Sequence, residues 1–150
     1  MRHSPRSLEY ELARVLLVDD DPTSRLTLKT VLEAGGYFVD SAASGAEAVE
    51  KLEEGEYQLV LSDLDMESPQ AGLKVLAHAR MMDYKPATAL LTAYHNSMPD
   101  SARRSNSMLI EPEDVPGILS KVADLISERA TRRLQRQLRL SDRQLRTANA

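Results

Sequence analysis

Short apolar runs, separated by segments of mixed polarity, recur along the chain at intervals of about 20 to 30 residues. The runs occupy residues 14–18, 59–65, 87–92 and 108–110, and residues 37–43, although interrupted by Asp40 and Ser41, also predict a strand. Unbroken apolar runs of this length are typical of strands covered on both faces, as in parallel sheets. The segments between most of them place apolar residues at helical spacing. The alternation predicts a doubly wound α/β fold with a five-stranded parallel sheet and helices on both faces.

Capping signals define the first two expected helices. Pro22 suits the first turn of a helix, and Gly35 with Gly36 supplies its end. Ser44 and Glu47 have the spacing of a capping box, in which each side chain bonds the other's free backbone amide. These signals predict helices after the first and second strands.

The second half of the chain is less regular. A loop through Pro69 and Gly72 is expected to lead into a third helix that ends near Met82. Residues 94–107 are the least periodic part of the chain and predict a loop or one weak helix. A long helix is expected to begin near Val115.

The composition is that of one soluble domain rather than two. The chain has 150 residues, of which 42% are hydrophobic, and no cysteine, so disulfides and thiolate metal sites are excluded. Residues 1–13 lack the apolar core of a signal peptide, and no run approaches membrane-spanning length. We expect a cytoplasmic protein, with residues 1–13 as an extension and residues 14–126 as the domain.

Charge separates the C-terminal segment from the rest. Residues 127–150 hold seven arginines against Glu128 and Asp142, a net charge of +5, which leaves −9 on residues 1–126. The segment also carries a thin apolar stripe, formed by Ile126, Ala130, Leu134, Leu138 and Leu145. It is interpreted as an arginine-rich helical extension that is either solvated or part of a coiled coil. A coiled coil would form a homodimer through residues 115–148 or pass a signal to an output domain beyond Ala150. Nucleic acid is an unlikely partner, because residues 127–150 contain no aromatic residue and no helix-turn-helix pattern.

Residues suited to metal and phosphate chemistry stand where the apolar runs end. In a parallel sheet of this kind those ends share one edge, which should bring together Asp19, Asp20, Asp63, Asp65, Thr92 and Glu111. Two unit charges about 4 Å apart interact by roughly 4 kcal/mol at an effective dielectric near 20, so a bound divalent cation would relieve the repulsion. Oxygen ligands suit Mg²⁺, and a carboxylate beside it suits phosphoryl transfer onto aspartate. Three acids stand where a glycine-rich phosphate loop would follow the first strand, which argues against dinucleotide binding.

Three separated motifs make residues 14–126 resemble the receiver domains of two-component response regulators, which have a flavodoxin-like fold. The motifs are residues 18–22, 62–66 and 91–93. The resemblance implies that Asp63 accepts a phosphoryl group from a sensor histidine kinase or a phosphotransfer protein. It further implies that Asp20, Asp63 and the Asp65 carbonyl bind Mg²⁺, and that Asp19 acts through water.

The same resemblance assigns Thr92 and Ala93 to the phosphate switch, and a signalling rather than an enzymatic role to the domain. One departure concerns the lysine that in this family contacts the phosphoryl group, because Glu111 stands at its position, before Pro112. We therefore predict that Asp63 is phosphorylated poorly or transiently.

Two alternative functions follow from the same residues. Without effective phosphorylation, the chain would be a pseudo-receiver that serves as a protein-interaction or dimerisation module. The sequence Asp63-Leu64-Asp65 also resembles the two-aspartate motif of haloacid-dehalogenase-type phosphatases. Glu67 stands where that motif has a small or hydroxylated residue, and little chain follows for its other motifs, so this alternative is the weaker one.

Overall fold

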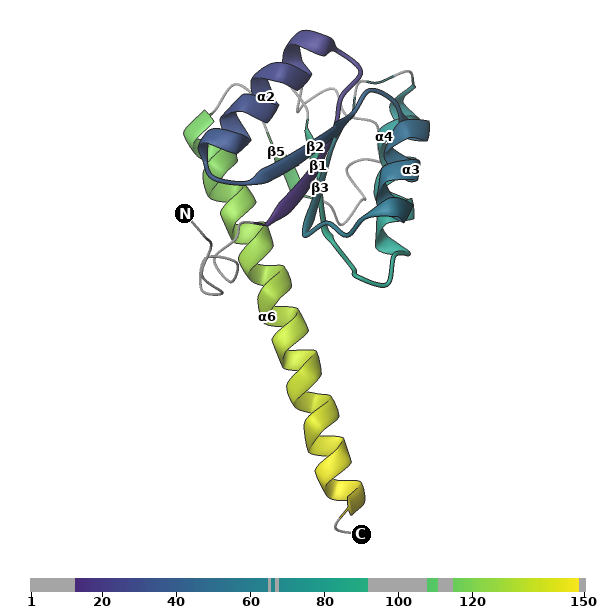
Figure 1. Cartoon of the computed structure of the whole chain (residues 1–150), viewed down its shortest axis with the longest axis vertical. Coiled ribbons are helices and arrows are strands. Elements are labelled where there is room, and N and C mark those ends of the chain that lie inside the picture. The colour runs from purple at the N-terminus through teal and green to yellow at the C-terminus, as the bar shows by residue number, and fades with distance from the viewer. Residues whose placement is uncertain (1–12, 65, 67, 92–107, 111–114, 149–150) are drawn as a thin grey trace, which may run out of the picture.

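A five-stranded parallel sheet forms the centre of the molecule (Figure 1). The computed structural model describes residues 13–64, 66, 68–91, 108–110 and 115–148. The strands are β1 (Arg14–Val18), β2 (Phe38–Ala42), β3 (Leu59–Asp63), β4 (Ala87–Leu91) and β5 (Met108–Ile110). They pair in parallel in the order β2-β1-β3-β4-β5. The predicted doubly wound α/β fold is confirmed.

Helices cover both faces of the sheet (Figure 1). They are α2 (Pro22–Ala34), α3 (Gly45–Glu54), α4 (Pro69–Arg80) and α6 (Val115–Ala148). Helices α3 and α4 pack on one face, while α2 and the first part of α6 pack on the other. None of the helices in the described part of the chain has the length and apolarity needed to cross a membrane.

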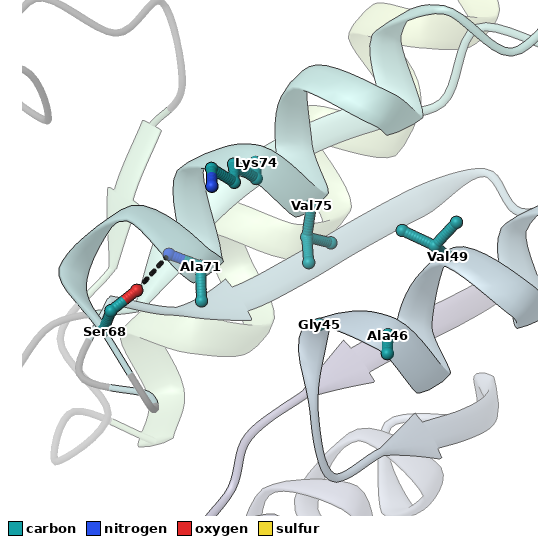
Figure 2. A pocket seen from close by; sticks show the side chains of 7 residues that line it. All are labelled: Gly45, Ala46, Val49, Ser68, Ala71, Lys74 and Val75. Carbon is teal, nitrogen blue, oxygen red and sulfur yellow. Dashed lines mark hydrogen bonds between the residues drawn. The ribbon is translucent and has the colours of Figure 1, made fainter.

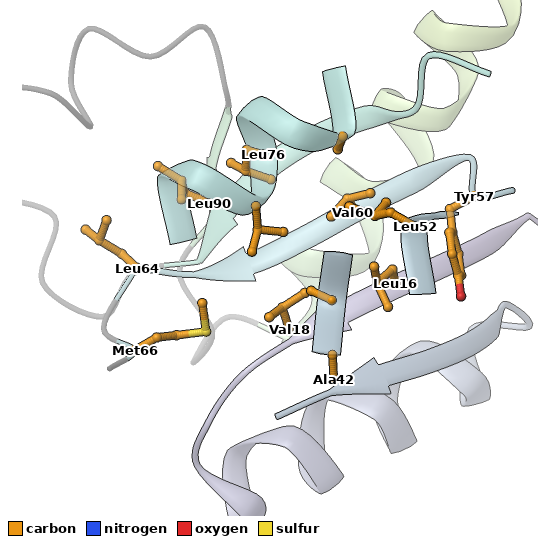
Figure 3. Packing of buried hydrophobic residues seen from close by; sticks show 13 residues of the cluster. Leu16, Val18, Ala42, Leu52, Tyr57, Val60, Leu64, Met66, Leu76 and Leu90 are labelled. Atoms are coloured by element: carbon orange, nitrogen blue, oxygen red, sulfur yellow. The ribbon is translucent and has the colours of Figure 1, made fainter. Parts of the chain in front are cut away.

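The central strands β1 and β3 are buried on both faces over most of their length, because each face meets a helical layer. Along β1, Leu16 and Val18 point into the cluster under α3 and α4 (Figure 3), and Val15 and Leu17 into the cluster under α2 and α6. All four are fully buried. The unbroken apolar runs in the sequence therefore reflect strands that are buried on both sides.

The predicted cap of α3 forms in altered form. The Ser44 hydroxyl accepts a hydrogen bond from the Glu47 amide at 3.1 Å, as expected. The Glu47 carboxylate accepts from the amide of Ala43 at 2.7 Å, instead of from that of Ser44. Glu47 thus ties the end of β2 to the start of α3.

Helix α4 begins earlier than the sequence predicts. Its N-cap is Ser68, whose hydroxyl accepts from the Ala71 amide at 3.2 Å, and Pro69 is the first helical residue. The prediction of a loop through Gly72 is therefore wrong, because Gly72 lies in the first turn of the helix. The missing side chain of Gly72 has a packing reason, given below.

Helix α6 is one continuous helix of 34 residues that extends well away from the sheet (Figure 1). Its start at Val115 confirms the prediction. Ile118, Val122, Leu125 and Arg129 are buried against the body, whereas residues 130–148 are exposed. The helix runs without a break through the predicted domain boundary at residue 126. Most of the predicted N-terminal extension, and the segment 94–107, lie outside the described residues.

Candidate functional site

Three aspartates meet at the carboxyl end of the sheet. Val18, the last residue of β1, pairs with Ser62 of β3. Asp19, which follows β1, and Asp63, the last residue of β3, therefore lie side by side. Asp20 follows directly. One carboxylate oxygen from each of Asp19, Asp20 and Asp63 lies within 4.8 Å of the others. The predicted convergence of these three acids is present.

Asp19 is held in place by its backbone and its carboxylate. Its amide donates to the Ala42 carbonyl at 3.0 Å, and its carbonyl accepts from the Arg25 guanidinium at 2.8 Å. The Asp19 carboxylate accepts from the Asp21 amide at 2.9 Å. Asp21 also caps α2, since its carboxylate accepts from the Ser24 amide at 2.9 Å. The acidic turn is thus hydrogen-bonded to β2 and α2, and its third acid caps α2.

Burial raises the pKa of Asp19 above its ordinary value, because the side chain is only 2% exposed. The hydrogen bonds from the Asp21 amide and with Asp63 oppose this rise, while the charges of Asp20 and Asp21 add to it. The cluster therefore brings three carboxylates together, one of them buried. A hard divalent cation with oxygen ligands matches this set of donors.

The backbone on both sides of Asp63 is fixed by neighbours. Asp63 pairs with Leu91 of β4, and the Leu64 amide donates to the Leu91 carbonyl at 3.0 Å. Leu64 and Met66, which follow Asp63, are buried in the cluster under α3 and α4 (Figure 3). Burial of these two side chains anchors the chain just beyond the acid.

Gly72 is a functional position that the sequence reasoning missed. A Cβ atom on Gly72 would lie 2.5 Å from the Asp63 carbonyl oxygen and 3.2 Å from the Ser62 hydroxyl. Only glycine lets the first turn of α4 approach the backbone of Asp63 this closely. The sequence signal for this position is Ser68-Pro69, which is typical of a helix start and would place Gly72 inside the helix. A glycine inside a helix usually marks a close packing contact.

The remaining predicted site residues, Asp65, Thr92, Ala93 and Glu111, lie outside the described residues. Two of them directly follow described strand ends: Leu91 precedes Thr92, and Ile110 precedes Glu111. Leu91 pairs with both Asp63 and Ile110. The roles of these four residues stay predictions.

A cavity of about 360 Å³ lies between the first turns of α3 and α4 (Figure 2). It is lined by Gly45, Ala46, Val49, Ser68, Ala71, Lys74 and Val75. None of these residues belongs to the predicted site. Among the described residues, its lining shares no side chain with the acid cluster.

A family model described as the response regulator receiver domain matches residues 15–106. The chain belongs to this family. Receiver domains are signalling domains of two-component systems, so the receiver hypothesis holds over the phosphatase alternative. The matched region ends before Glu111.

Known relatives agree with this assignment. The chain is 32% identical over 127 residues to the transcriptional regulatory protein GlrR of Escherichia coli, covering 82% of this chain and 28% of that protein. The response regulator protein TrrA from Thermotoga maritima, solved in complex with Mg²⁺-BeF, is 32% identical with a TM-score of 0.64, covering 76% of this chain and 99% of that chain. TrrA in complex with the histidine kinase ThkA matches with a TM-score of 0.66 at 32% identity, over 76% of this chain and 98% of that chain. The chain spans little more than a quarter of GlrR.

Proposed function

We propose that this receiver domain accepts a phosphoryl group on Asp63 from a sensor histidine kinase or a phosphotransfer protein. The observation that carries the proposal is the meeting of Asp19, Asp20 and Asp63 at the carboxyl end of the sheet, with one buried acid among them. The solved complexes of TrrA with Mg²⁺-BeF and with a kinase support it by similarity. Asp19, Asp20, Asp63 and Asp65 would hold Mg²⁺.

The reaction proposed for Asp63 is a direct transfer. A carboxylate oxygen of Asp63 forms a bond to phosphorus, while the bond between phosphorus and the imidazole nitrogen of a phosphohistidine donor breaks and the nitrogen keeps the electron pair. Mg²⁺ would supply positive charge against the phosphoryl oxygens. The pairing of Asp63 with Leu91 and the contact with Gly72 keep the accepting carboxylate in position, and the Thr92 hydroxyl would contact the transferred group.

Glu111 is proposed to make this transfer inefficient. A phosphoryl group carries nearly two negative charges, and a lysine at position 111 would offset part of them, whereas glutamate adds to them. Replacing an attractive charge by a repulsive one about 4 Å from the phosphoryl group costs roughly several kcal/mol at an effective dielectric near 20. Solvent screening lowers that cost. A pseudo-receiver that works as a fixed binding surface is the second candidate function, and the absence of the lysine favours it.

Labelling with acetyl phosphate tests the choice of Asp63 and the role of Glu111. The full chain, Asp63→Asn and Glu111→Lys are incubated with acetyl phosphate and Mg²⁺ and read by intact mass. We expect slow or partial labelling of the wild type, none in Asp63→Asn, and at least tenfold more in Glu111→Lys. Labelling that survives in Asp63→Asn would remove Asp63 from its role, and efficient wild-type labelling that Glu111→Lys does not improve would defeat the electrostatic argument.

A calorimetric titration with Mg²⁺ tests the metal site independently. Asp20→Ala should weaken binding at least tenfold, because it removes one of three clustered carboxylates. Asp124→Ala removes an equal charge from the exposed surface of α6 and should leave the affinity unchanged. Equal affinities in the two variants would argue against this site.

Helix α6 is proposed as the output element of a cytoplasmic regulator. It is the part of the described chain that leaves the body of the domain (Figure 1). The helix would act on a second copy of the chain through residues 115–148, or on an output domain beyond Ala150.

A further inference from the structure

The outer part of α6 exposes leucines that its own body does not cover. Leu134, Leu138, Leu140 and Leu145 are 51–64% exposed, and residues 130–148 are all exposed. Isolated helices of about 12 to 15 residues are only marginally stable in water, so a long unpacked helix is normally supported by a partner.

A heptad seam runs along this part of the helix. Its positions, spaced alternately by three and four residues, are Thr131, Leu134, Leu138, Ser141, Leu145 and Ala148. Residues at this spacing share one face and form the a and d positions of a two-stranded coiled coil. Leu140 does not belong to the seam, because it falls two positions after Leu138.

The arginines avoid this seam and its flanks. In the same heptad numbering all seven arginines from Arg129 to Arg146 occupy the outer positions b, c and f. The flanking e and g positions hold Gln135, Gln137, Asp142 and Gln144. Asp142 pairs with Arg146 of the same helix at 3.0 Å. Two copies can therefore meet along the seam without bringing like charges into contact.

The body lies on the opposite side of the helix from the seam. The residues of α6 that are buried against the body are Ile118, Val122, Leu125 and Arg129, which fall at positions b and f of the same heptad numbering. Positions b and f face away from a and d. The seam is consequently presented outward, where a second helix can reach it without meeting the receiver body.

We propose that residues 131–148 form a parallel, two-stranded coiled coil with the same residues of a second copy. The proposal deepens the output role given to α6 above and needs no phosphoryl group. In a parallel pair, Leu134, Leu138 and Leu145 each lie opposite the same residue of the second copy. This arrangement makes three layers of paired leucines. Antiparallel pairing over the same residues would place Leu138 opposite Ser141 and leave two such layers. Toward the body, Asp124 and Ser127 occupy seam positions, so the two helices separate there.

Sedimentation of the full chain tests the seam with a matched pair of variants. The wild type should sediment as a dimer at micromolar concentration. Leu138→Glu should weaken association at least 100-fold, whereas Leu140→Glu, the same change on the outer face, should alter it less than threefold. Both sites are exposed, so circular dichroism should show a folded receiver body in each. A monomeric wild type at millimolar concentration, a higher oligomer, or equal effects of the two variants would overturn the proposal.

Single cysteines test the orientation, since the chain contains none of its own. Under mild oxidation Ser141→Cys should form an intermolecular disulfide in high yield, and Leu140→Cys should not. Efficient crosslinking between Leu138→Cys and Ser141→Cys in a mixture, with little in Ser141→Cys alone, would show antiparallel pairing and overturn the parallel arrangement. Asp63→Asn should dimerise like the wild type, so a failure of phosphorylation and a failure of dimerisation are read separately.

Discussion

The two ends of the sheet treat charge in opposite ways. At the carboxyl end, Asp19, Asp20 and Asp63 place three like charges together, and Asp19 is almost fully buried. At the amino end, the buried cation Arg129 donates hydrogen bonds to two backbone carbonyls. The first arrangement offers oxygen ligands suited to a divalent cation, and the second is hydrogen-bonded within the chain.

The contacts of Arg129 show how backbone carbonyls satisfy a buried cation. Its guanidinium donates to the Lys85 carbonyl at 2.9 Å and to the Tyr84 carbonyl at 2.6 Å. The Tyr84 hydroxyl in turn donates to the Leu52 carbonyl at 2.8 Å. Helix α6 is thereby joined through the α4–β4 turn to α3. The amino end thus satisfies its buried charge with backbone carbonyls, whereas the carboxyl end gathers like charges of the kind that bind a cation.

The largest effect is expected at Gly72, where the carboxyl end depends on close packing. Gly72→Ala places a Cβ against the Asp63 carbonyl and should lower the free energy of unfolding by about 2–3 kcal/mol. It should also slow labelling of Asp63. The control is Gly55→Ala, because that Cβ would meet only the end of the flexible Arg14 side chain at 3.3 Å. Urea unfolding of both variants measures the difference, and equal stabilities would show that the close approach is relaxed without cost.

A smaller effect is expected from breaking the amino end. Arg129→Met keeps much of the apolar stem but removes the hydrogen bonds to Tyr84 and Lys85, at a cost of about 1–2 kcal/mol. Arg136→Met removes an exposed arginine of the same helix and should change stability by less than about 0.5 kcal/mol. Thermal unfolding compares the two. If Arg136→Met is as costly as Arg129→Met, the buried hydrogen bonds are not the source of the stability.

The smallest effect, and one of opposite sign, is expected at Asp19. Its raised pKa means that the folded state holds a proton more tightly than the unfolded state does, so the acid costs stability once the pH exceeds its folded pKa. With a chelator at pH 7, Asp19→Asn should therefore unfold at a slightly higher temperature than the wild type.

The gain should shrink as the pH falls through the folded pKa toward the ordinary value of 3.8, because the wild-type carboxyl then becomes neutral as well. Saturating Mg²⁺ should reverse the order of the two proteins. Scanning calorimetry across pH follows both changes, and a wild type that is the more stable protein at neutral pH in chelator would refute the prediction.

Strand positions could be predicted from the sequence because burial on both faces leaves an unbroken apolar signal. The meeting of Asp19 with Asp63 followed from a general property of parallel sheets, which does not depend on side-chain detail. The start of α4 differs from the prediction because Gly72 does not mark a loop. The glycine is required by a close contact with β3, which is distant in the sequence. Local patterns do not contain such contacts.

Arg129 was missed for a related reason. An arginine within an arginine-rich helical segment looks solvated, and its burial depends on two carbonyls that lie 44 and 45 residues earlier in the chain. The predicted domain boundary at residue 126 likewise follows from treating the arginine-rich segment as solvated. Sequence pattern gave the helix and its stripe, but it could not show where the helix leaves the body.

The Arg129 contacts also fix the rotational phase of α6. A helix turns by about 100° per residue, so the direction in which residues 131–148 present their seam is set by the number of residues after Arg129. One residue inserted between Arg129 and Thr131 would swing the seam by about 100° toward the side of its own receiver body. A seven-residue insertion would restore the direction to within about 20° and move the seam outward by roughly 10 Å. In the proposed dimer, the number of residues between Arg129 and the seam therefore determines the angle at which the two receiver bodies face each other.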